Sequence, residues 1–370
     1  MTPPHLVLLC VSAGAGHVRA PAALGAHAEA AGVKITQIDV ITRMPAWFRW
    51  LYADMYTSLV NRMPSLWRWL YGRTNRAGDH GLLQRLRRAA ERRLSKRWLD
   101  EVAALAPDAI VCTHFLPAEV LTQPASRLRC PLFVQVTDFD LHAMWVQSGI
   151  DAYFVGCEEV AFQLRRAGVP AERIVVSGLA VMPAFQPALA LPPRADPGLP
   201  TVLLMGGGGG FGGLDRVAHQ LLSEVDGFQL LVVAGRNAAA LAALQAIVPS
   251  WPGRLRAVGF TDQIATLMAG ADIVITKPGG LTSAECLAVG VALIVNAPIP
   301  GQEERNADYL LEQGVAFKAI DGATLAFRLR MLLDQPERRQ QMAARARLLG
   351  RPDAARHIID TILTHLKAPC

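Results

Sequence analysis

The sequence predicts an α/β protein with two doubly wound, Rossmann-like domains facing a cleft. Short apolar runs rich in Val, Ile and Leu alternate with helix-like stretches along the 370 residues. The runs are apolar at consecutive positions, which is typical of parallel strands covered by helices on both faces. Residues 183–200 contain six prolines and divide the runs into two series, because proline at this density interrupts both helices and sheets.

The expected strands follow one rhythm in each half. They span residues 6–12, 34–40, 108–114, 132–138, 152–157 and 174–178, and then 201–207, 229–235, 254–260, 272–278, 292–297 and 315–319. The expected parts are an N-terminal domain (1–182), a linker (183–200), a C-terminal domain (201–350) and a final helix (351–370) that packs back on the N-terminal domain. A single domain with one long surface loop is the alternative, but such loops are uncommon.

Composition excludes several classes of protein. Hydrophobic residues make up 52% and charged residues 18% of the chain, which excludes a disordered protein, a coiled coil and a fibrous repeat. The six cysteines form no C-x-x-C pair, which fits neither a zinc site nor a disulfide framework. The N-terminus lacks a cationic region, and no apolar run approaches the ~18 residues of a membrane-spanning helix. We expect a cytoplasmic protein that is peripheral on the cytoplasmic face of the membrane.

The basic charge is concentrated in residues 43–99. This segment holds thirteen of the 37 Lys and Arg but only three of the 31 Asp and Glu, together with five of the seven tryptophans. Trp and Arg together suit a bilayer interface, because the indole lies at headgroup depth and the guanidinium meets lipid phosphate. The residues expected to contact an anionic membrane surface are Trp47, Arg49, Trp50, Trp67, Arg68, Trp69 and Arg73.

Two other interpretations of this basic segment stay open. A pair of packed helices with a solvated arginine face is the structural one. Nucleic-acid binding is the other, because Arg and aromatic side chains also contact phosphates and stack on bases. No nucleic-acid-binding module accompanies the segment, so we expect no nucleic acid as a partner.

Two glycine-rich loops each follow an expected strand and precede a helix-like stretch. Residues 12–17 read SAGAGH and residues 206–213 read GGGGGFGG. Glycine lets backbone N–H groups approach a diphosphate, and the helix N-terminus adds positive potential. The second loop is neither a P-loop nor a dinucleotide fingerprint, because no Lys-Ser/Thr pair follows it and the next strand ends Val-Ala-Gly rather than in an acid. A tight turn is the alternative.

His17 closes the first of these loops at the start of a helix. A helix N-terminus favours the neutral imidazole, which accepts a proton. A lone histidine is nevertheless more often structural than catalytic, so its position alone does not decide its role.

Three segments resemble one family of glycosyltransferases. Residues 275–310 (ITKPGGLTSAECLAVGVALIVNAPIPGQEERNADYL) are similar to the nucleotide-sugar half of GT-B enzymes in the family of the diacylglycerol galactosyl- and glucosyltransferases (monogalactosyldiacylglycerol synthase-like) and the MurG-type enzymes. Residues 137–160 resemble the T-D-F-x-x-H-x-x-W block of the diacylglycerol branch, and residues 14–17 its G-x-G-H loop. The motifs lie in both halves, so the resemblance covers essentially the whole chain and implies the GT-B fold.

The resemblance implies donor-binding roles in the C-terminal half. Glu285 matches the acid that binds the ribose hydroxyls of UDP, and a carboxylate can accept both hydroxyl donors at once. Phe260 matches the residue whose backbone recognises uracil. The other donor-binding residues are Gly207, Gly208, Gly209, Gly279, Gly280, Leu281 and Thr282 at the diphosphate, and Gln302, Glu303 and Asn306 at the sugar. A solvated helix start is the alternative for Glu303.

In the N-terminal half the resemblance implies the acceptor site and the catalytic base. His17 is the expected base, and Asp138 either orients it or is itself the first alternative, with His142 and His114 as further alternatives. The expected acceptor-binding residues are Gly14, Gly16, His142 and Trp145. If residues 138–145 are helical, Asp138, His142 and Trp145 share one helical face, which either lines the acceptor site or simply packs.

We expect no metal and no cofactor besides the UDP-sugar co-substrate. Asp138 and Asp140 match a D-x-D metal motif only superficially, because GT-B enzymes stabilise the leaving diphosphate with backbone groups and helix ends.

The expected activity is an inverting transfer of galactose or glucose from a UDP-sugar to diacylglycerol at the membrane surface, which forms a β-glycolipid. One alternative is a MurG-like transfer of N-acetylglucosamine to a polyprenyl-linked acceptor, against which the T-D-F-x-x-H-x-x-W block argues. A UDP-sugar sensor without catalytic activity is the other, against which the presence of both His17 and Glu285 argues. Galactose and glucose both stay open as the transferred sugar.

Overall fold

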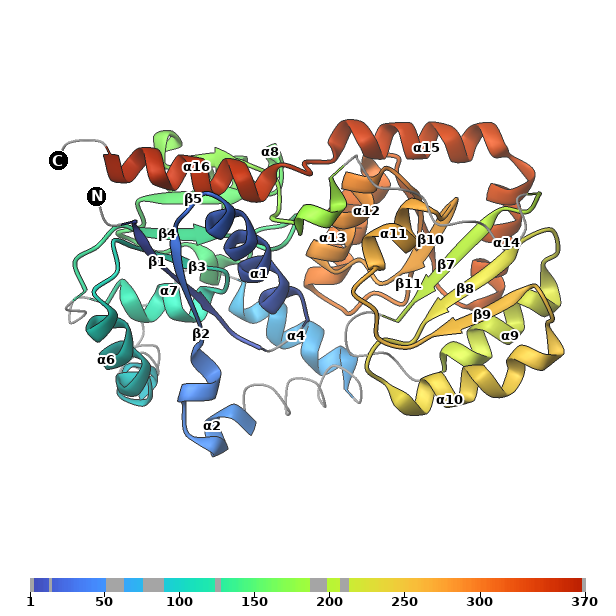
Figure 1. Ribbon diagram of the computed structural model, residues 1–370, viewed down its shortest axis with the longest axis horizontal. Helices are drawn as coiled ribbons and strands as arrows, with labels where there is room; N and C mark the ends of the chain where they lie inside the picture. Colours follow the sequence, from blue (N-terminus) through green and yellow to red (C-terminus); the bar gives the residue numbers. More distant parts are fainter. Residues whose placement is uncertain are drawn as a thin grey trace. The chain divides into compact units, whose positions relative to one another are not determined.

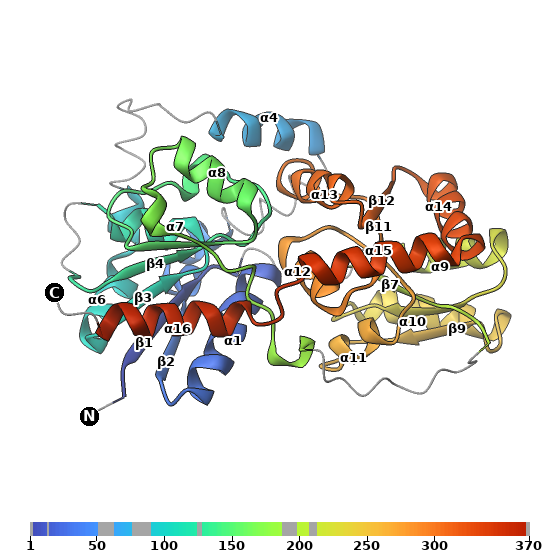
Figure 2. The ribbon, with the colours of Figure 1, turned by 90° about the horizontal axis from the view of Figure 1, so that it is seen from above.

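The structure is a computed structural model and describes residues 3–12, 15–50, 63–75, 90–123, 128–186, 198–206 and 213–367 (Figures 1 and 2). The side chains of residues 15–17, 64, 70 and 74 are outside this description as well. The chain forms two compact units. The first comprises Met1–Pro183, Pro300–Gln302 and Asp353–Cys370, and the second comprises Ala184–Ile299 and Glu303–Pro352. Residues 187–197 of the expected linker lie outside the described residues.

A parallel six-stranded sheet forms the centre of the first unit. Its strands in spatial order are β2 (Lys34–Asp39), β1 (His5–Cys10), β3 (Ala109–Cys112), β4 (Leu132–Gln135), β5 (Ala152–Val155) and β6 (Ile174–Val176). Strands β1, β3, β4 and β5 are buried at every position, which is the burial expected of parallel strands covered on both faces.

Helices complete the core of the first unit. α1 (Ala15–Ala30) and α16 (Ala354–Lys367) lie side by side and share one apolar core with the sheet, to which Leu24, Phe133 and Ile358 contribute (Figures 1 and 2). α7 (Phe115–Leu121) packs on β3 and β4, and α8 (Glu158–Arg166) packs on β5 and β6. Two 3-10 helices, η4 (Ala171–Arg173) and η5 (Pro183–Phe185), lie near the end of the unit.

The connection between β2 and β3 contains most of the basic segment. Its described elements are η1 (Val40–Arg43), α2 (Ala46–Arg49), α4 (Pro64–Thr74) and α6 (Lys96–Leu105). Residues 51–62 and 76–89 of this connection lie outside the described residues. α6 packs against η1 and buries Trp98 completely.

The second unit is built on a second parallel six-stranded sheet. Its spatial order is β12 (Ala316–Ala319), β11 (Ala292–Asn296), β10 (Ile273–Thr276), β7 (Thr201–Met205), β8 (Gln229–Val233) and β9 (Leu255–Val258). Its helices are α9 (Leu214–Glu224), α10 (Ala238–Ile247), η6 (Val248–Ser250), α11 (Ile264–Ala269), α12 (Gly280–Val289), α13 (Gln302–Glu312), α14 (Gly322–Asp334) and α15 (Pro336–Leu349). Leu221, Leu244 and Leu329 join the strands in its apolar core.

The strand orders show where each sheet reverses its winding. In the first sheet the chain runs from β1 to β2 and then continues on the other side of β1, so the reversal lies between β1 and β3. In the second sheet the reversal lies between β7 and β10. Ligands of open parallel sheets bind beyond the carboxyl ends of the strands at such a reversal. All twelve expected strands are present, which confirms the predicted fold class of two doubly wound α/β domains.

Candidate functional site

The expected donor residues of the second unit lie in loops at the carboxyl edge of its sheet. The glycine-rich loop follows β7, residues 277–279 follow β10, and Phe260 follows β9. The first of these loops is described only at Gly206 and Gly213; the expected diphosphate ligands Gly207, Gly208 and Gly209 lie outside the described residues. The loops after β7 and β10 flank the reversal of the sheet, which is where a ligand is expected.

The N-terminus of α12 follows the loop after β10. Gly279 is its N-cap with extended backbone, and its carbonyl accepts the first helical hydrogen bond from the Ser283 N–H at 2.9 Å. The N–H groups of Gly280, Leu281 and Thr282 therefore have no acceptor earlier in the helix. Together with the helix dipole they form the kind of site that binds an anion such as a phosphate.

Glu285 lies one turn further along α12 and is 1% exposed. Two polar residues near it in the chain, Thr276 and Ser283, are also buried. Burying a carboxylate is costly unless polar groups compensate, so such a residue is kept for a reason other than packing. A buried acid next to a helix N-terminus at the sheet reversal fits a residue that accepts hydroxyl donors from a ligand.

Lys277 is a residue to which the sequence analysis gave no role. It lies between β10 and α12, and burial lowers the pKa of its ammonium below the ordinary 10.5, while the nearby Glu303 carboxylate raises it. A half-buried lysine beside a helix N-terminus adds a full positive charge to the partial charges of the N–H groups. The strand ends of the second unit thus combine two sources of positive potential, the Lys277 ammonium and the N-terminus of α12.

Glu303 is not simply a solvated residue at the start of α13. Its Oε2 atom accepts a hydrogen bond from the Ile299 N–H at 2.7 Å, which fixes the carboxylate beside the loop after β11. Its Oε1 atom would lie 3.9 Å from a Cβ atom placed on Gly279. The acid therefore lies next to the N-cap of α12. Asn306, on the same helix, is completely buried, and Gln302 is partly buried.

Phe260 is 64% exposed, and a second residue that the sequence analysis missed lies over its ring. The Cζ atom of Arg236 is 4.6 Å from the centroid of the Phe260 ring. Arg236 follows β8 and Phe260 follows β9, and these strands are adjacent in the sheet. No short motif marks Arg236 in the sequence, because the contact joins two loops that only the strand pairing brings together.

In the first unit, the expected base lies at the sheet reversal. His17 is the third residue of α1, which follows β1, and Gly16 precedes it in the same turn. Gly14 and the side chain of His17 lie outside the described residues. Upstream, the Ser12 N–H donates to the Asp39 carboxylate at 3.2 Å and so ties the loop after β1 to the end of β2.

A cluster of histidine and aromatic side chains lies in the same unit. The ring centroids of His114 and Phe115 are 4.1 Å apart, those of Phe115 and Trp145 5.8 Å, and those of Tyr71 and His142 4.7 Å. His114 follows β3, on the other side of the sheet reversal from the loop after β1. The expected acceptor residues His142 and Trp145 are therefore together, and the cluster adds three residues absent from the expected site.

Both histidines of this cluster have a defined tautomer. The Nδ1 atom of His142 accepts the Met144 N–H at 3.2 Å, and that of His114 accepts the Leu116 N–H at 3.1 Å. In the neutral ring the proton therefore lies on Nε2. Burial lowers the pKa of His142, and a backbone hydrogen bond with Tyr71 acts in the opposite direction.

The shared helical face of Asp138, His142 and Trp145 does not form. Residues 138–140 are bends, and the only helix here is the three-residue η3 (Ala143–Trp145), with His142 as its N-cap. Two hydrogen bonds explain this: the His142 side chain takes the Met144 N–H, and the distant Asn75 side chain takes the Ala143 N–H at 2.8 Å, so neither is left to extend a helix. Asp138 is half-buried and lies three residues after β4.

The tryptophans of the basic segment divide into two kinds. Trp47, Trp50 and Trp69 are each more than half exposed. Trp98 is completely buried in α6, and Trp67 is turned inward, where its Nε1–H donates to the Pro300 carbonyl at 2.9 Å. Trp67 is half-buried, and its expected contact with a membrane stays a prediction.

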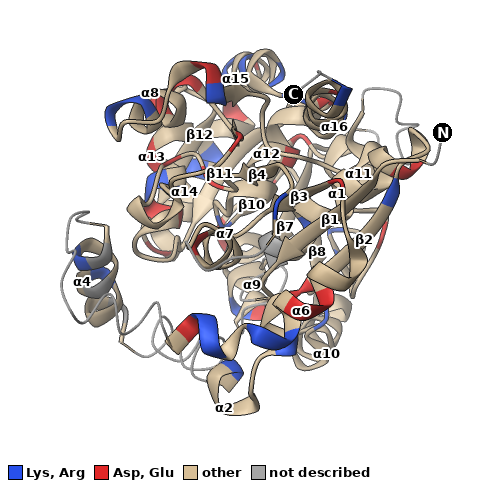
Figure 3. Cartoon of the chain, turned by 90° about the vertical axis from the view of Figure 1, so that its left-hand side faces the viewer, with Lys and Arg blue, Asp and Glu red and all other residues tan. Residues whose placement is uncertain are grey.

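Helix α4 has two different faces. Trp67, Tyr71 and Asn75 lie on the inner one, and Met63, Leu66 and Trp69 are exposed on the outer one. Arg73 lies over the Trp69 ring at 5.5 Å. The blue positions of α4 in Figure 3 are arginines of this helix. An exposed apolar stripe with arginine beside it is typical of an interfacial helix.

Comparison with known proteins decides the family. Residues 17–181 match the monogalactosyldiacylglycerol (MGDG) synthase family, and residues 201–358 match the glycosyltransferase family 28 C-terminal domain. A processive diacylglycerol beta-glucosyltransferase of Bacillus thuringiensis (strain Al Hakam) is 30% identical over 264 residues, which are 70% of this chain and 68% of that protein. The chain is a glycosyltransferase of the MGDG synthase family.

Solved structures agree with this assignment at the level of the fold. MurG of Acinetobacter baumannii has a TM-score of 0.62 at 18% identity and covers 98% of this chain, with 100% of its own chain matched. A UDP-glucosyltransferase of Polygonum tinctorium has a TM-score of 0.66 at 14% identity, with both chains covered completely. The predicted resemblance and the GT-B fold are therefore confirmed.

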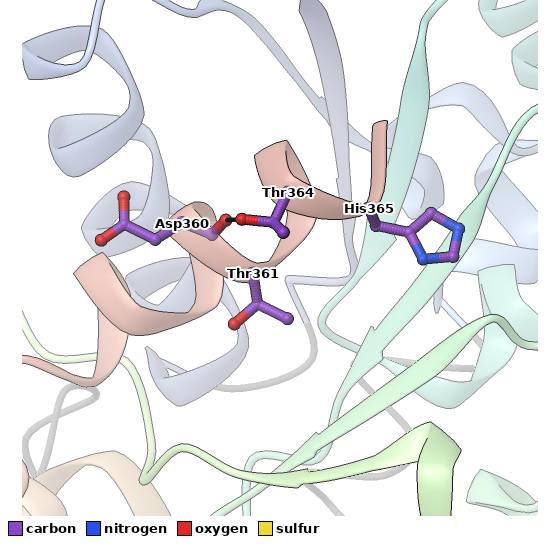
Figure 4. A pocket seen from close by; sticks show the side chains of 4 residues that line it. All are labelled: Asp360, Thr361, Thr364 and His365. Carbon is purple, nitrogen blue, oxygen red and sulfur yellow. Dashed lines mark hydrogen bonds between the residues drawn. The ribbon is translucent and has the colours of Figure 1, made fainter. Parts of the chain in front are cut away.

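One pocket of this glycosyltransferase lies away from the candidate site. It measures about 430 Å³ and is lined by Asp360, Thr361, Thr364 and His365, all on α16 (Figure 4). Thr364 donates its hydroxyl proton to the Asp360 carbonyl at 2.8 Å, so this hydroxyl is already used within the helix. The pocket contains none of the expected site residues.

In the described ranges, no helix is long and apolar enough to cross a membrane.

Proposed function

We propose that this glycosyltransferase transfers glucose or galactose from a UDP-sugar to diacylglycerol at an anionic, cytoplasmic membrane surface. The family assignment supports the reaction class, and the name of the Bacillus relative makes UDP-glucose the first donor to test. The observation that carries the proposal is the N-terminus of α12 at the sheet reversal, with the buried Glu285 one turn beyond it.

In this proposal the second unit binds the UDP-sugar. The N–H groups of Gly280, Leu281 and Thr282 and the ammonium of Lys277 face the diphosphate. Glu285 accepts both ribose hydroxyls, and the Phe260 backbone recognises uracil. The sugar is held by Gln302, Glu303 and Asn306, and the loop with Gly207, Gly208 and Gly209 stabilises the diphosphate.

Transfer is a single displacement. The hydroxyl oxygen of diacylglycerol attacks the anomeric carbon while the bond from that carbon to the β-phosphate oxygen breaks, so the configuration inverts. His17 takes the hydroxyl proton, with Asp138 as the first alternative. The leaving UDP gains negative charge, and fixed donors that face this charge lower the barrier without a bound metal.

The acceptor belongs to the first unit. Its expected ligands are Gly14, Gly16, His142 and Trp145, and two observations support the last two. The His142 ring lies 4.7 Å from the Tyr71 ring, and Trp145 supplies an apolar wall beside Phe115, at 5.8 Å between ring centroids. Exposed Trp47, Trp50 and Trp69 with Arg49, Arg68 and Arg73 support attachment to anionic lipid.

Incubation of the purified protein with radiolabelled UDP-sugars and diacylglycerol vesicles tests the proposal. We expect one labelled β-hexosyl lipid from UDP-glucose or UDP-galactose, and equal yield with EDTA. Transfer only from UDP-N-acetylglucosamine to a polyprenyl-linked acceptor would assign a MurG-like activity instead. Tight UDP binding without transfer to any lipid would indicate a sensor, and loss of transfer with EDTA that magnesium restores would contradict the metal-free mechanism.

A further inference from the structure

We propose that Arg236 reads the nucleobase of the donor and makes the site selective for uracil over cytosine. This inference rests on the proposed function, because it concerns the base of the same nucleotide. It assigns a specificity-determining role to a side chain that lies outside the expected set of donor ligands.

The first observation is the placement of the side chain. Arg236 and Phe260 come from the loops after two adjacent strands, and the guanidinium lies over the ring at 4.6 Å. Both side chains are exposed, and among the described residues Arg236 has no hydrogen bond or ion pair. A guanidinium stacked on a ring keeps its N–H donors in its own plane, directed outward from the stack. Its donors are therefore available to a ligand.

The second observation is that both loops are tied in place. The Ala234 N–H donates to the Val258 carbonyl at 2.9 Å, which extends the pairing with β9 by one residue beyond the end of β8. A Cβ atom on Gly259 would lie 3.1 Å from the Leu241 side chain and 4.0 Å from the Gly235 carbonyl. The backbone before Phe260 is therefore packed closely against α10, and Gly235 has the positive φ of 63° that favours glycine. A selective contact requires that the loops carrying the contacting side chains are held in fixed positions.

The chemistry of the bases gives the direction of the selectivity. Uracil presents a carbonyl oxygen at C4, which accepts a hydrogen bond, whereas cytosine has an amino group there, which donates one. A guanidinium has donors only, so it pairs with uracil and faces the cytosine amino group donor to donor. A site whose polar group is left without a partner rejects the analogue strongly. Because the partner is charged, a loss of roughly ten- to a hundredfold in affinity is expected.

Calorimetry with the full-length protein tests the inference, with UDP, CDP and uridine as ligands. The variants are Arg236→Met, which removes the donors, and Arg236→Lys, which keeps the charge but loses the planar fork. Arg256→Met is the matched control, because Arg256 is an exposed arginine on β9 within the same unit. We expect the parent to prefer UDP over CDP about tenfold or more, and both Arg236 variants to lose most of this preference through weaker UDP and uridine binding.

Each of the following results would overturn the inference. Equal affinity of the parent for UDP and CDP removes the selectivity itself. Weaker UDP binding with unchanged uridine binding in Arg236→Met, or full UDP affinity in Arg236→Lys, assigns the side chain to the diphosphate as a point charge. If the folded Arg236→Met protein keeps the parental preference for UDP over CDP, then the contact between Arg236 and Phe260 has no part in base selection. A parent that binds neither nucleotide overturns the proposed function as well, and so the two failures are distinguishable.

Coupling between the two side chains provides a second measurement. If the Phe260 ring positions the guanidinium, then Phe260→Leu lowers the preference for UDP, and Arg236→Met in that background has a smaller effect than in the parent. Additive effects of the two substitutions would contradict a positioning role for the ring. The Phe260 backbone, which the proposed function assigns to uracil, is present in every variant.

Discussion

The two units share an architecture of six parallel strands but differ in the connection that crosses their first strand. In the second unit this connection, residues 259–272 between β9 and β10, contains only the short α11. In the first unit the corresponding connection is residues 40–108 between β2 and β3, and it contains α2, α4 and α6 with most of the basic segment. The connection that crosses the first strand is therefore short in the second unit and long in the first unit.

The difference separates two ways of building a site. The donor residues proposed for the second unit lie in short loops and at helix starts near strand ends, so backbone groups are expected to do much of the binding. The first unit has a cluster of side chains from distant segments, which α4 joins through Tyr71 and Asn75. Substitutions in the first unit are therefore expected to change turnover and lipid binding. Substitutions in the second unit are expected to change nucleotide affinity.

The largest effect is expected at His17. If it is the base, His17→Ala lowers turnover by about 10²–10⁴-fold while UDP affinity stays within error of the parent, because the proposed nucleotide site belongs to the other unit. Rates from labelled sugar transfer and Kd from calorimetry measure the two quantities. His357→Ala, at an exposed position of α16, is the control. More than about a tenth of parental turnover in His17→Ala would move the base to Asp138.

The next effect concerns the insertion in the first unit. Replacement of Arg49, Arg68 and Arg73 by Ala is expected to weaken binding to anionic vesicles by up to about a hundredfold at low salt, since each arginine near the surface contributes about 1 kcal/mol. The loss should shrink as salt rises. UDP affinity is expected to stay unchanged.

Vesicle sedimentation measures this binding, and exposed arginines of the second unit provide the control. Replacement of Arg256, Arg345 and Arg351 by Ala removes the same charge from the other unit. Equal sedimentation of the first triple variant and the parent would favour the packed-helix interpretation of the segment. Equal losses in both triple variants would indicate a general charge effect instead of a membrane-binding helix.

A smaller effect is expected at Glu285 in the second unit. Glu285→Gln keeps the volume of the buried side chain but loses the charge that accepts the ribose hydroxyls. A hydrogen bond to a charged group contributes about 1.5–3 kcal/mol, so UDP affinity should fall roughly ten- to a hundredfold. Calorimetry measures the affinity, and Glu312→Gln, exposed on α13, is the control. Unchanged affinity in the folded Glu285 variant would remove this residue from the site.

The fold was predictable because its strands are buried on both faces and so leave continuous apolar runs in the sequence. The candidate donor site was predictable for a related reason: Gly279 and Glu285 lie in one contiguous motif around a single helix start. Arg236 was not, because its contact with Phe260 depends on the pairing of β8 with β9.

In the first unit, the conformation of residues 138–145 and the orientation of Trp67 and Trp69 could not be predicted from the sequence, for physical reasons. Whether residues 138–145 form a helix depends on the Asn75 side chain, which comes from a different helix and takes the Ala143 N–H. Trp67 and Trp69 are alike in sequence, yet only the packing of α4 decides that one is turned inward and the other outward. Side-chain sites assembled from distant segments leave no local pattern to read.

The smallest effect is expected at Lys277. Its charge should make the affinity of the second unit for UDP depend on pH in the alkaline range. Burial lowers the pKa of Lys277 below 10.5, so this residue loses its charge at a lower pH than an exposed lysine does. UDP affinity should therefore fall as the pH rises through that lowered pKa. Lys277→Arg, which stays charged, should abolish this alkaline decline, and Lys277→Met should bind UDP about tenfold more weakly near neutral pH, with a flat profile.

Calorimetric titrations of UDP from neutral to alkaline pH measure this decline, with Lys318→Met on β12 as the control in the same unit. The lowered pKa also has a consequence for folding: the unfolded chain binds the proton more tightly, so the contribution of Lys277 to stability rises with pH between the lowered value and 10.5. Affinity and stability should therefore change in opposite directions over this range. A parallel fall of both would mean that the alkaline loss of binding reflects unfolding, and the ammonium would then have no part in holding the diphosphate.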